Sequence, residues 1–162
     1  VCLNSDDYYL DTKAVELEVM RLEEAEADAC YANTKCIDGV TGKELSHWRG
    51  VDTFYPPFGE IPNHQTFMIK KSVMQELLLY NLNYQVSADS HFIYKMVASN
   101  KKFVFLDKEI VVYRLGGYSG QHPEIVFQNQ EDAFYEVFAK KLALTRADIM
   151  LLAHISDIDS DF

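Results

Sequence analysis

The chain contains few of the residues that several protein classes require. Its 162 residues include only three cysteines, four prolines, seven glycines and one tryptophan. The cysteines, Cys2, Cys30 and Cys36, are odd in number and lack CxxC spacing, which argues against a zinc site, a redox pair or a disulfide framework. Their apolar neighbours indicate small buried core residues in a reducing compartment.

Basic residues are also scarce. Fifteen Lys and Arg stand against 25 Asp and Glu, so the formal net charge is −10, and no basic block is longer than a lysine pair. Because nucleic-acid binding depends on neutralising backbone phosphates, this balance argues against a nucleic-acid partner.

Long apolar runs are missing as well. No run approaches the roughly 18 residues of a membrane span, and the start has no signal-peptide pattern. We therefore expect a soluble cytoplasmic protein, with peripheral attachment to the inner face of a membrane as a further option. What the chain does have is 48% apolar and 13% aromatic residues, enough for the core of one folded domain.

The most informative stretch is the beginning. The apolar run Val1–Leu3 leads into Asn4, Ser5, Asp6 and Asp7. A buried strand followed by acids is typical of the carboxyl edge of an α/β sheet, where ligands bind, and a divalent cation would neutralise two adjacent carboxylates. The alternative is that Asn and Asp simply end the strand, because their side chains hydrogen-bond nearby backbone.

Periodicity predicts alternating helices and strands, an α/β fold. A helix capped by Asp11 runs to about Glu26 and a strand covers 28–38, so strand, helix, strand predicts a right-handed parallel crossover. Aromatic and proline residues in 44–63 indicate a binding loop or a packed surface loop. Further predicted elements are a strand at 64–69, a helix from Ser72 to Tyr80 with Gln75 in a capping box, strands at 103–106 and 110–115, a helix from Pro123, and a short helix started by Thr145 and Asp148.

A further predicted helix, capped by Ser87, carries an acid on its inward face. Asp89 falls on the same side as the apolar residues Phe92 and Met96, in the first turn. The acid is either functional or simply favoured there by the helix macrodipole. Similarly, the Gly116-Gly117-Tyr118-Ser119 stretch permits close approach to a ligand, or is only a turn.

Taken in order, four segments resemble the second half of family-2 glycosyltransferases with the GT-A fold. The similarity covers roughly 1–119, and although no single motif is specific, four in order make a strong signal. The segments are Asn4-Ser5-Asp6-Asp7, His64-Gln65-Thr66-Phe67, Ser87-Ala88-Asp89 and Gly116-Gly117-Tyr118-Ser119.

The resemblance implies roles for these residues. In that family the acidic pair binds a divalent metal, Mn²⁺ or Mg²⁺, that bridges the diphosphate of a nucleotide sugar; here Asp6 and Asp7 match, with Asp7 the expected direct ligand. Asp89 matches the catalytic base of inverting members, which takes the proton from the acceptor hydroxyl. His122 is a candidate third metal ligand, although its spacing does not show this. The implied substrate-binding residues are Asn4, Ser5, His64, Gln65, Gly117 and Ser119.

The implied activity is sugar transfer from a nucleotide-sugar donor to a glycan or lipid-linked acceptor, in bacterial surface polysaccharide synthesis. The family's nucleotide-binding half has no counterpart upstream of Val1. We therefore expect a truncated GT-A-type mixed sheet in residues 1–122, a packed helical extension in 123–162, and no activity from this fragment alone.

Two other functions compete with this one. The first is a non-catalytic interaction or scaffold domain derived from a transferase, with a homodimer formed through an exposed sheet edge. The second is a metal-dependent phosphohydrolase, which would need a denser set of Asp, Glu and His ligands.

Overall fold

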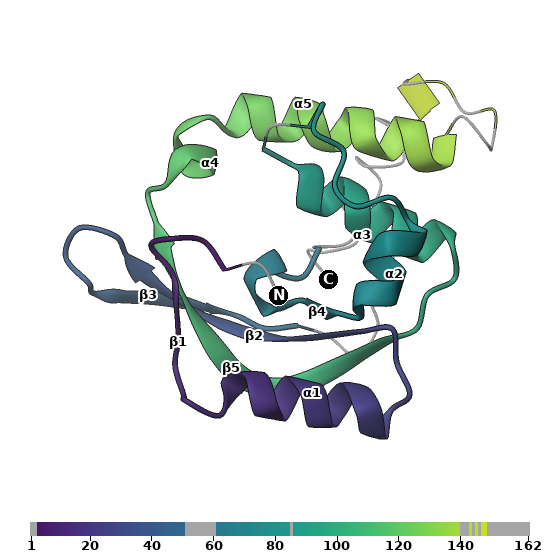
Figure 1. The fold of residues 1–162 in the computed structure, drawn as a ribbon. Coiled ribbons are helices and arrows are strands. Elements are labelled where there is room, and N and C mark those ends of the chain that lie inside the picture. Colours follow the sequence, from purple (N-terminus) through teal and green to yellow (C-terminus); the bar gives the residue numbers. More distant parts are fainter. Residues whose placement is uncertain are drawn as a thin grey trace, which may run out of the picture.

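A mixed β-sheet runs through the middle of the molecule, with helices on both faces (Figure 1). The structure, a computed structural model, describes residues 3–50, 61–84 and 86–139, together with 143, 145, 147 and 148. These residues form one α/β domain with an open sheet, which confirms the predicted fold class at that level. Among them, no helix is long and apolar enough to cross a membrane.

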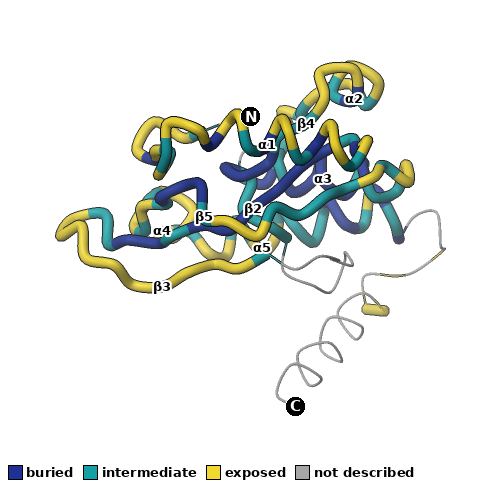
Figure 2. The backbone as a smooth tube through the Cα atoms, turned by 90° about the horizontal axis from the view of Figure 1, so that it is seen from below, coloured by how far each residue is buried: buried dark blue, intermediate teal, exposed yellow. Residues whose placement is uncertain are grey.

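The sheet has a parallel centre and antiparallel flanks. Strands β2 (Ala29–Asp38) and β5 (Phe103–Leu115) pair in parallel, β1 (Tyr8–Tyr9) pairs antiparallel with β5, and β3 (Glu44–Trp48) and β4 (Met68–Ile69) pair antiparallel with β2. Figure 2 shows β2 mostly buried and β3 exposed. A central strand covered on both faces needs apolar or small residues throughout, which β2 largely supplies.

β1, the strand that precedes the first helix of the described residues, does not form the predicted parallel crossover with β2. β1 runs antiparallel to β5, and β5 runs parallel to β2, so β1 and β2 run in opposite directions. Leu3 lies outside any strand and 5–6 form a turn, while Val1 and Cys2 lie outside the described residues. The parallel neighbour of β2 is β5, which comes much later in the chain.

Helices cover the two faces of the sheet unequally. α1 (Ala14–Glu24) lies on one face, and α2 (Lys71–Glu76), α3 (Ala88–Ala98) and α5 (Pro123–Phe134) lie on the other (Figure 1). The main core fills the space between α3 and the sheet. Its buried members are Ala29, Tyr31, Phe67, Val73, Phe92, Ile93 and Met96.

Several helix starts follow the sequence signals. Ser87 is the N-cap residue of α3, although its hydroxyl donates to the Val126 carbonyl (3.4 Å) instead of capping the helix. Pro123 occupies the first turn of α5, as predicted. The predicted cap at Asp11 is wrong, because the N-cap residue of α1 is Lys13; Asp11 Oδ1 accepts a hydrogen bond from Lys13 N at 2.8 Å, before the helix.

The carboxyl-terminal part of the chain is described only in part. α5 continues into a π-helical segment, Tyr135–Ala139, and Phe134 and Val137 pack with Tyr94 of α3. Thr145 and Asp148 exchange the hydrogen bonds of the predicted capping box: Asp148 Oδ2 accepts from Thr145 N (2.8 Å), and Thr145 Oγ1 accepts from Asp148 N (3.2 Å). The rest of the predicted extension lies outside the described residues.

Three local predictions are corrected. The segment 64–69 is not one strand but a 3₁₀ helix, His64–Thr66, followed by the short β4. Asn63 caps this turn by accepting a hydrogen bond from Gln65 N at 3.2 Å, and a capping Asn favours helical backbone over strand. The helix capping box at Ser72 is also wrong, because α2 already begins at Lys71 and has no side-chain cap. The two strands predicted at 103–106 and 110–115 are one, β5.

The stretch predicted as a loop at 44–63 begins as a strand, β3, and residues 51–60 lie outside the description. Cys30 and Cys36 are buried free thiols, as predicted, and Cys2 is not described. Beyond α2, Leu78 (φ 61°) and Leu79 (φ 58°) adopt left-handed backbone, which costs an L-residue about 1–2 kcal/mol.

Candidate functional site

A cavity of about 580 Å³ opens between the amino-terminal turn, the start of α3 and the end of β5. It brings together seven of the ten residues that sequence reasoning assigned to a site, from four segments far apart in the chain. These are Asn4, Ser5, Asp6, His64, Asp89, Gly117 and Ser119. The four segments on which the family resemblance depends therefore meet in space.

A second, smaller cavity of about 180 Å³ adjoins the first. His64, Asp89 and Ser119 line both cavities, and the smaller one adds Trp48 from the end of β3 and Gln65. His64 and Asp89 thus lie where the two cavities meet. Two ligand groups, one in each cavity, could approach the same carboxylate.

The side chains of Asp89 and His64 contact each other at this junction. His64 Nδ1 lies 2.7 Å from Asp89 Oδ2, and the side chains are about a third and a quarter exposed. The other carboxylate oxygen, Oδ1, accepts a hydrogen bond from Ser90 N at 2.8 Å. The carboxylate is therefore held at both oxygens yet is still reachable from the cavities, the arrangement that a general base needs.

Local sequence explains how these two side chains arrive. Asp89 stands in the first turn of α3, where the helix macrodipole favours an acid, and Phe92 and Met96 of the same helix anchor it in the core. His64 begins the 3₁₀ helix capped by Asn63, and its side chain contacts Asp89 of α3. Both alternatives for Asp89, helix-favoured acid and functional acid, are thus compatible with its position.

Asp6 and Asp7, although adjacent, have different environments. Asp6 is exposed and lines the large cavity. Asp7 is buried, its Oδ2 accepts a hydrogen bond from Gln65 Nε2 (2.9 Å), and its Oδ1 accepts one from Arg114 N (2.9 Å). Asp7 therefore ties the amino-terminal turn to the 3₁₀ helix and to β5, and this placement favours Asp6 as the carboxylate available to a cation.

Sequence reasoning missed Tyr113, which lines both cavities. Burial raises the pKa of Tyr113, and the nearby charges of Asp7, Asp6 and Asp89 raise it further, so the phenol stays neutral and able to donate a hydrogen bond. Its ring centroid lies 5.1 Å from that of Trp48. The available signal was its position near the carboxyl end of a parallel strand, where α/β sheets bind ligands.

The glycine-containing stretch after β5 lines part of the large cavity. Gly116 has φ +102°, a backbone that L side chains rarely adopt, so the sharp turn there favours glycine. This turn brings Gly117 and Ser119 to the cavity, Ser119 on the short helix α4 (Tyr118–Gln121).

The predicted third metal ligand does not join the site. His122 lines neither cavity; its Nδ1 lies 3.6 Å from Glu124 Oε1 and its ring packs against Tyr118. Within the part of the chain that the structure describes, no three His, Cys, Asp or Glu side chains gather as a ready metal site. A metal at Asp6 would have to take most of its ligands from a bound substrate or from water.

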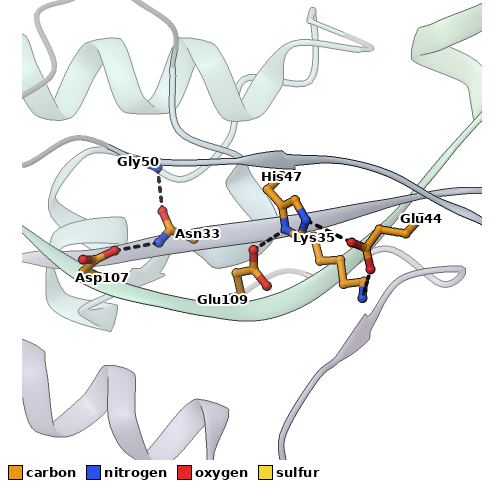
Figure 3. A network of polar contacts seen from close by, with 7 residues as sticks. All are labelled: Asn33, Lys35, Glu44, His47, Gly50, Asp107 and Glu109. Atoms are coloured by element: carbon orange, nitrogen blue, oxygen red, sulfur yellow. Dashed lines mark hydrogen bonds and ion pairs between the residues drawn. The ribbon is translucent and has the colours of Figure 1, made fainter.

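A separate polar network lies on β2, β3 and β5 (Figure 3). His47 contacts both Glu109 and Glu44, and Glu44 also pairs with Lys35, which lowers the pKa of Glu44. Each of these groups has its partner inside the network, and none lines the two cavities. The network therefore fastens β3 to the sheet, and its charges oppose strand addition at this edge.

Comparison with models of known protein families gave no match, and comparison with curated proteins gave none either.

Proposed function

We propose that this chain carries the catalytic base and the metal-facing acid of an inverting glycosyltransferase that uses a nucleotide-sugar donor. The observation that supports this most is the shared boundary of the two cavities. Asp6 lies in one, Trp48 lies in the other, and the Asp89–His64 pair belongs to both. A transferase needs such an arrangement, because donor and acceptor must meet at one base.

In the proposed reaction Asp89 acts on the acceptor. Its carboxylate takes the proton of an acceptor hydroxyl while that oxygen attacks the anomeric carbon of the donor sugar. The bond from the anomeric carbon to the diphosphate oxygen breaks, and its electron pair leaves with the diphosphate. Attack on the face opposite the leaving group inverts the anomeric centre.

The donor side would contain Asp6, Asn4, Ser5 and Gly117. A Mg²⁺ or Mn²⁺ ion is commonly held by one or two carboxylates together with substrate phosphates, and the single carboxylate of Asp6 fits that sparse mode. When bound, the ion would neutralise charge on the departing diphosphate. We propose a glycan or lipid-linked acceptor on the side of Trp48, because aromatic rings pack well against the apolar faces of sugars.

The proposal is tested by calorimetric titration of the 162-residue chain with UDP, GDP and ADP, each with and without Mn²⁺. Because the proposed metal and diphosphate contacts lie within these 162 residues, we expect metal-dependent binding of at least one nucleotide even from a chain that does not turn over, and we expect Asp6→Asn to abolish it. Glu23→Gln, an exposed acid on the other face of the sheet, is the matched control and should bind like the wild type. Binding that ignores both the metal and Asp6→Asn would contradict the proposal, and so would the absence of all nucleotide binding, which favours a scaffold role.

A further inference from the structure

The loop after α2 exposes an unusual concentration of leucine. We call residues 77–83 the leucine loop. Within five residues, the side chains of Leu78, Leu79 and Leu82 are 83%, 54% and 89% exposed. Scattered exposed leucines are ordinary, but three within five residues concentrate apolar surface on one short loop, and concentrated exposed apolar surface commonly marks a site of interaction.

The backbone holds this loop in an unfavourable conformation. Leu78 and Leu79 both have left-handed φ values, 61° and 58°, in which bulky side chains are rare. The turn is nevertheless fixed, because Leu78 N donates to Gln75 O (3.2 Å) and Leu79 N donates to Met74 O (2.9 Å). Strain of this kind concentrates at functional segments, and here its effect is to present the leucines outward.

The segment that leads into the leucine loop is basic, in contrast to the acidic chain as a whole. Lys70 and Lys71 are exposed at the start of α2, and the Lys95 ammonium donates to the carbonyl of Leu77. Glu76, the one acid in residues 70–83, is paired with Lys101 at 2.6 Å. Apolar side chains flanked by lysines complement an anionic bilayer, where leucines enter the headgroup layer and ammonium groups meet phosphates.

The leucine loop also adjoins the candidate site. Tyr80 lines the large cavity, and its ring packs edge-on against Phe92 of α3 at 5.4 Å between centroids. Figure 1 shows α2 and α3 on the same face of the sheet. A surface that docks through this loop would therefore lie close to the cavity opening.

We propose that the leucine loop docks the protein on an anionic lipid bilayer, so that the cavity lies over the membrane surface. If the proposed glycosyl transfer holds, this placement selects a lipid-linked acceptor. Docking itself does not depend on that function, because vesicle binding needs neither donor nor metal.

The test is cosedimentation of the full 162-residue chain with phosphatidylcholine vesicles that contain or lack phosphatidylglycerol. We expect binding to the anionic vesicles, weakened by salt. Replacing Leu78, Leu79 and Leu82 together by Ser should lower partitioning at least about tenfold. Lys70→Gln with Lys71→Gln should lower it about fivefold per lysine, on anionic vesicles only.

The control is a pair of substitutions on the opposite face of the sheet. Val15 and Met20 of α1 are 44% and 48% exposed, and Val15→Ser with Met20→Ser should leave partitioning unchanged. Thermal unfolding followed by circular dichroism verifies that each variant folds.

Unchanged vesicle binding by the folded leucine variant would overturn the proposal, as would a wild-type chain that ignores anionic vesicles. A dimer in sedimentation equilibrium that the leucine variant abolishes would overturn it too, because the loop would then bind a second copy. Nucleotide titrations separate this outcome from failure of the proposed function: loss of docking leaves metal-dependent nucleotide binding intact.

Discussion

One carboxylate is buried on each face of the sheet, and the two carboxylates differ in their hydrogen-bond partners. On the cavity side, Asp7 accepts hydrogen bonds from Gln65 and from the Arg114 backbone. On the α1 side, Glu18 is fully buried, and neither of its oxygens has a hydrogen-bond partner among the described residues. A buried carboxylate with donors can remain charged, whereas one without donors is driven to the neutral form.

The pKa of Glu18 follows this rule. Burial raises the pKa of Glu18 to about 8, so the group is mostly protonated at neutral pH. Burial, together with charge on the nearby Glu18, raises the pKa of the Cys30 thiol to about 12. The two buried groups on the α1 side, Glu18 and Cys30, therefore offer neither a mostly ionised carboxylate nor a reactive thiolate at neutral pH.

The candidate site differs from the surroundings of Glu18 because its carboxylates line a cavity. Asp6 and Asp89 reach a cavity, and Asp89 retains hydrogen-bond partners while it stays partly exposed. The candidate site thus combines three features that the described surroundings of Glu18 lack together: a carboxylate, donors that keep it oriented, and an adjoining cavity.

The largest expected effect is on catalysis by Asp89, the carboxylate that lines both cavities. In a protein competent for sugar transfer, Asp89→Asn should lower turnover by about 10²–10⁴, the range for loss of a general base. Single-turnover kinetics with saturating donor measure this directly. Glu18→Gln, a change to a carboxylate without access, should leave turnover at pH 7 within about twofold of wild type. Near wild-type turnover in Asp89→Asn would remove Asp89 from the role.

The next largest expected effect is on the stability of the protein, through the buried carboxylate of Glu18. Because the pKa of Glu18 rises from 4.5 unfolded to about 8 folded, the folded state holds an extra proton between these values. The contribution of this group to the free energy of unfolding should therefore be fully present below about pH 4.5, and fall by on the order of a few kcal/mol as pH rises to about 8.

Urea unfolding at several pH values measures this slope. Glu18→Gln keeps the shape but cannot ionise, so it should flatten the slope and be more stable than wild type at pH 8. An unaltered slope in Glu18→Gln would assign the pH dependence to other groups.

A smaller effect on stability is expected at Asp7, the buried carboxylate that has hydrogen-bond partners. Asp7→Asn places an amide donor against either Gln65 Nε2 or Arg114 N, and a buried donor left without an acceptor costs about 1–3 kcal/mol. Adding Gln65→Glu reverses the polarity of that contact and should restore most of the loss. Denaturation of both single variants and of the double variant forms the cycle; additive losses would show that the two residues are not coupled.

The smallest expected effect concerns the orientation of Asp89. The amide nitrogen of Asn can replace the Nδ1 donor of His64, whereas the longer Gln places its amide where Nε2 stands. His64→Asn should thus retain kcat, and His64→Gln should lower kcat about tenfold, the factor for about 1.4 kcal/mol, with little change in KM. Equal losses in both variants, or a loss confined to KM, would instead assign His64 to substrate binding.

Local signals account for much of the agreement between sequence and fold. Ser87 and Pro123 are found at the helix starts they predicted, and the strand predicted at 28–38 is β2 with almost the same bounds. Caps and strand periodicity depend on residues a few positions apart, so a sequence shows them directly. The 3₁₀ helix at His64 was missed because a single Asn63 cap outweighed an apolar alternation only a few residues long.

The sequence predicted many of the residues that line the large cavity, but not the difference between Asp6 and Asp7. The family resemblance named residues from four segments, and the cavity joins those segments. It could not tell Asp6 from Asp7, because the distinction depends on Gln65 and Arg114, donors that approach only when the 3₁₀ helix and β5 pack against the turn. Nor could it show that Tyr113 lines both cavities.

By itself, the sequence determined the α/β class, the helix starts at Ser87 and Pro123, the scarcity of basic charge and the residue types available for chemistry, since these depend on composition and on near neighbours. Only the tertiary structure decided which carboxylates are reachable, because access and hydrogen bonding depend on contacts between segments distant in the chain. Asp7 and Asp89 differ in the elements that surround them, and Glu18 differs from both by the absence of a donor among its described neighbours.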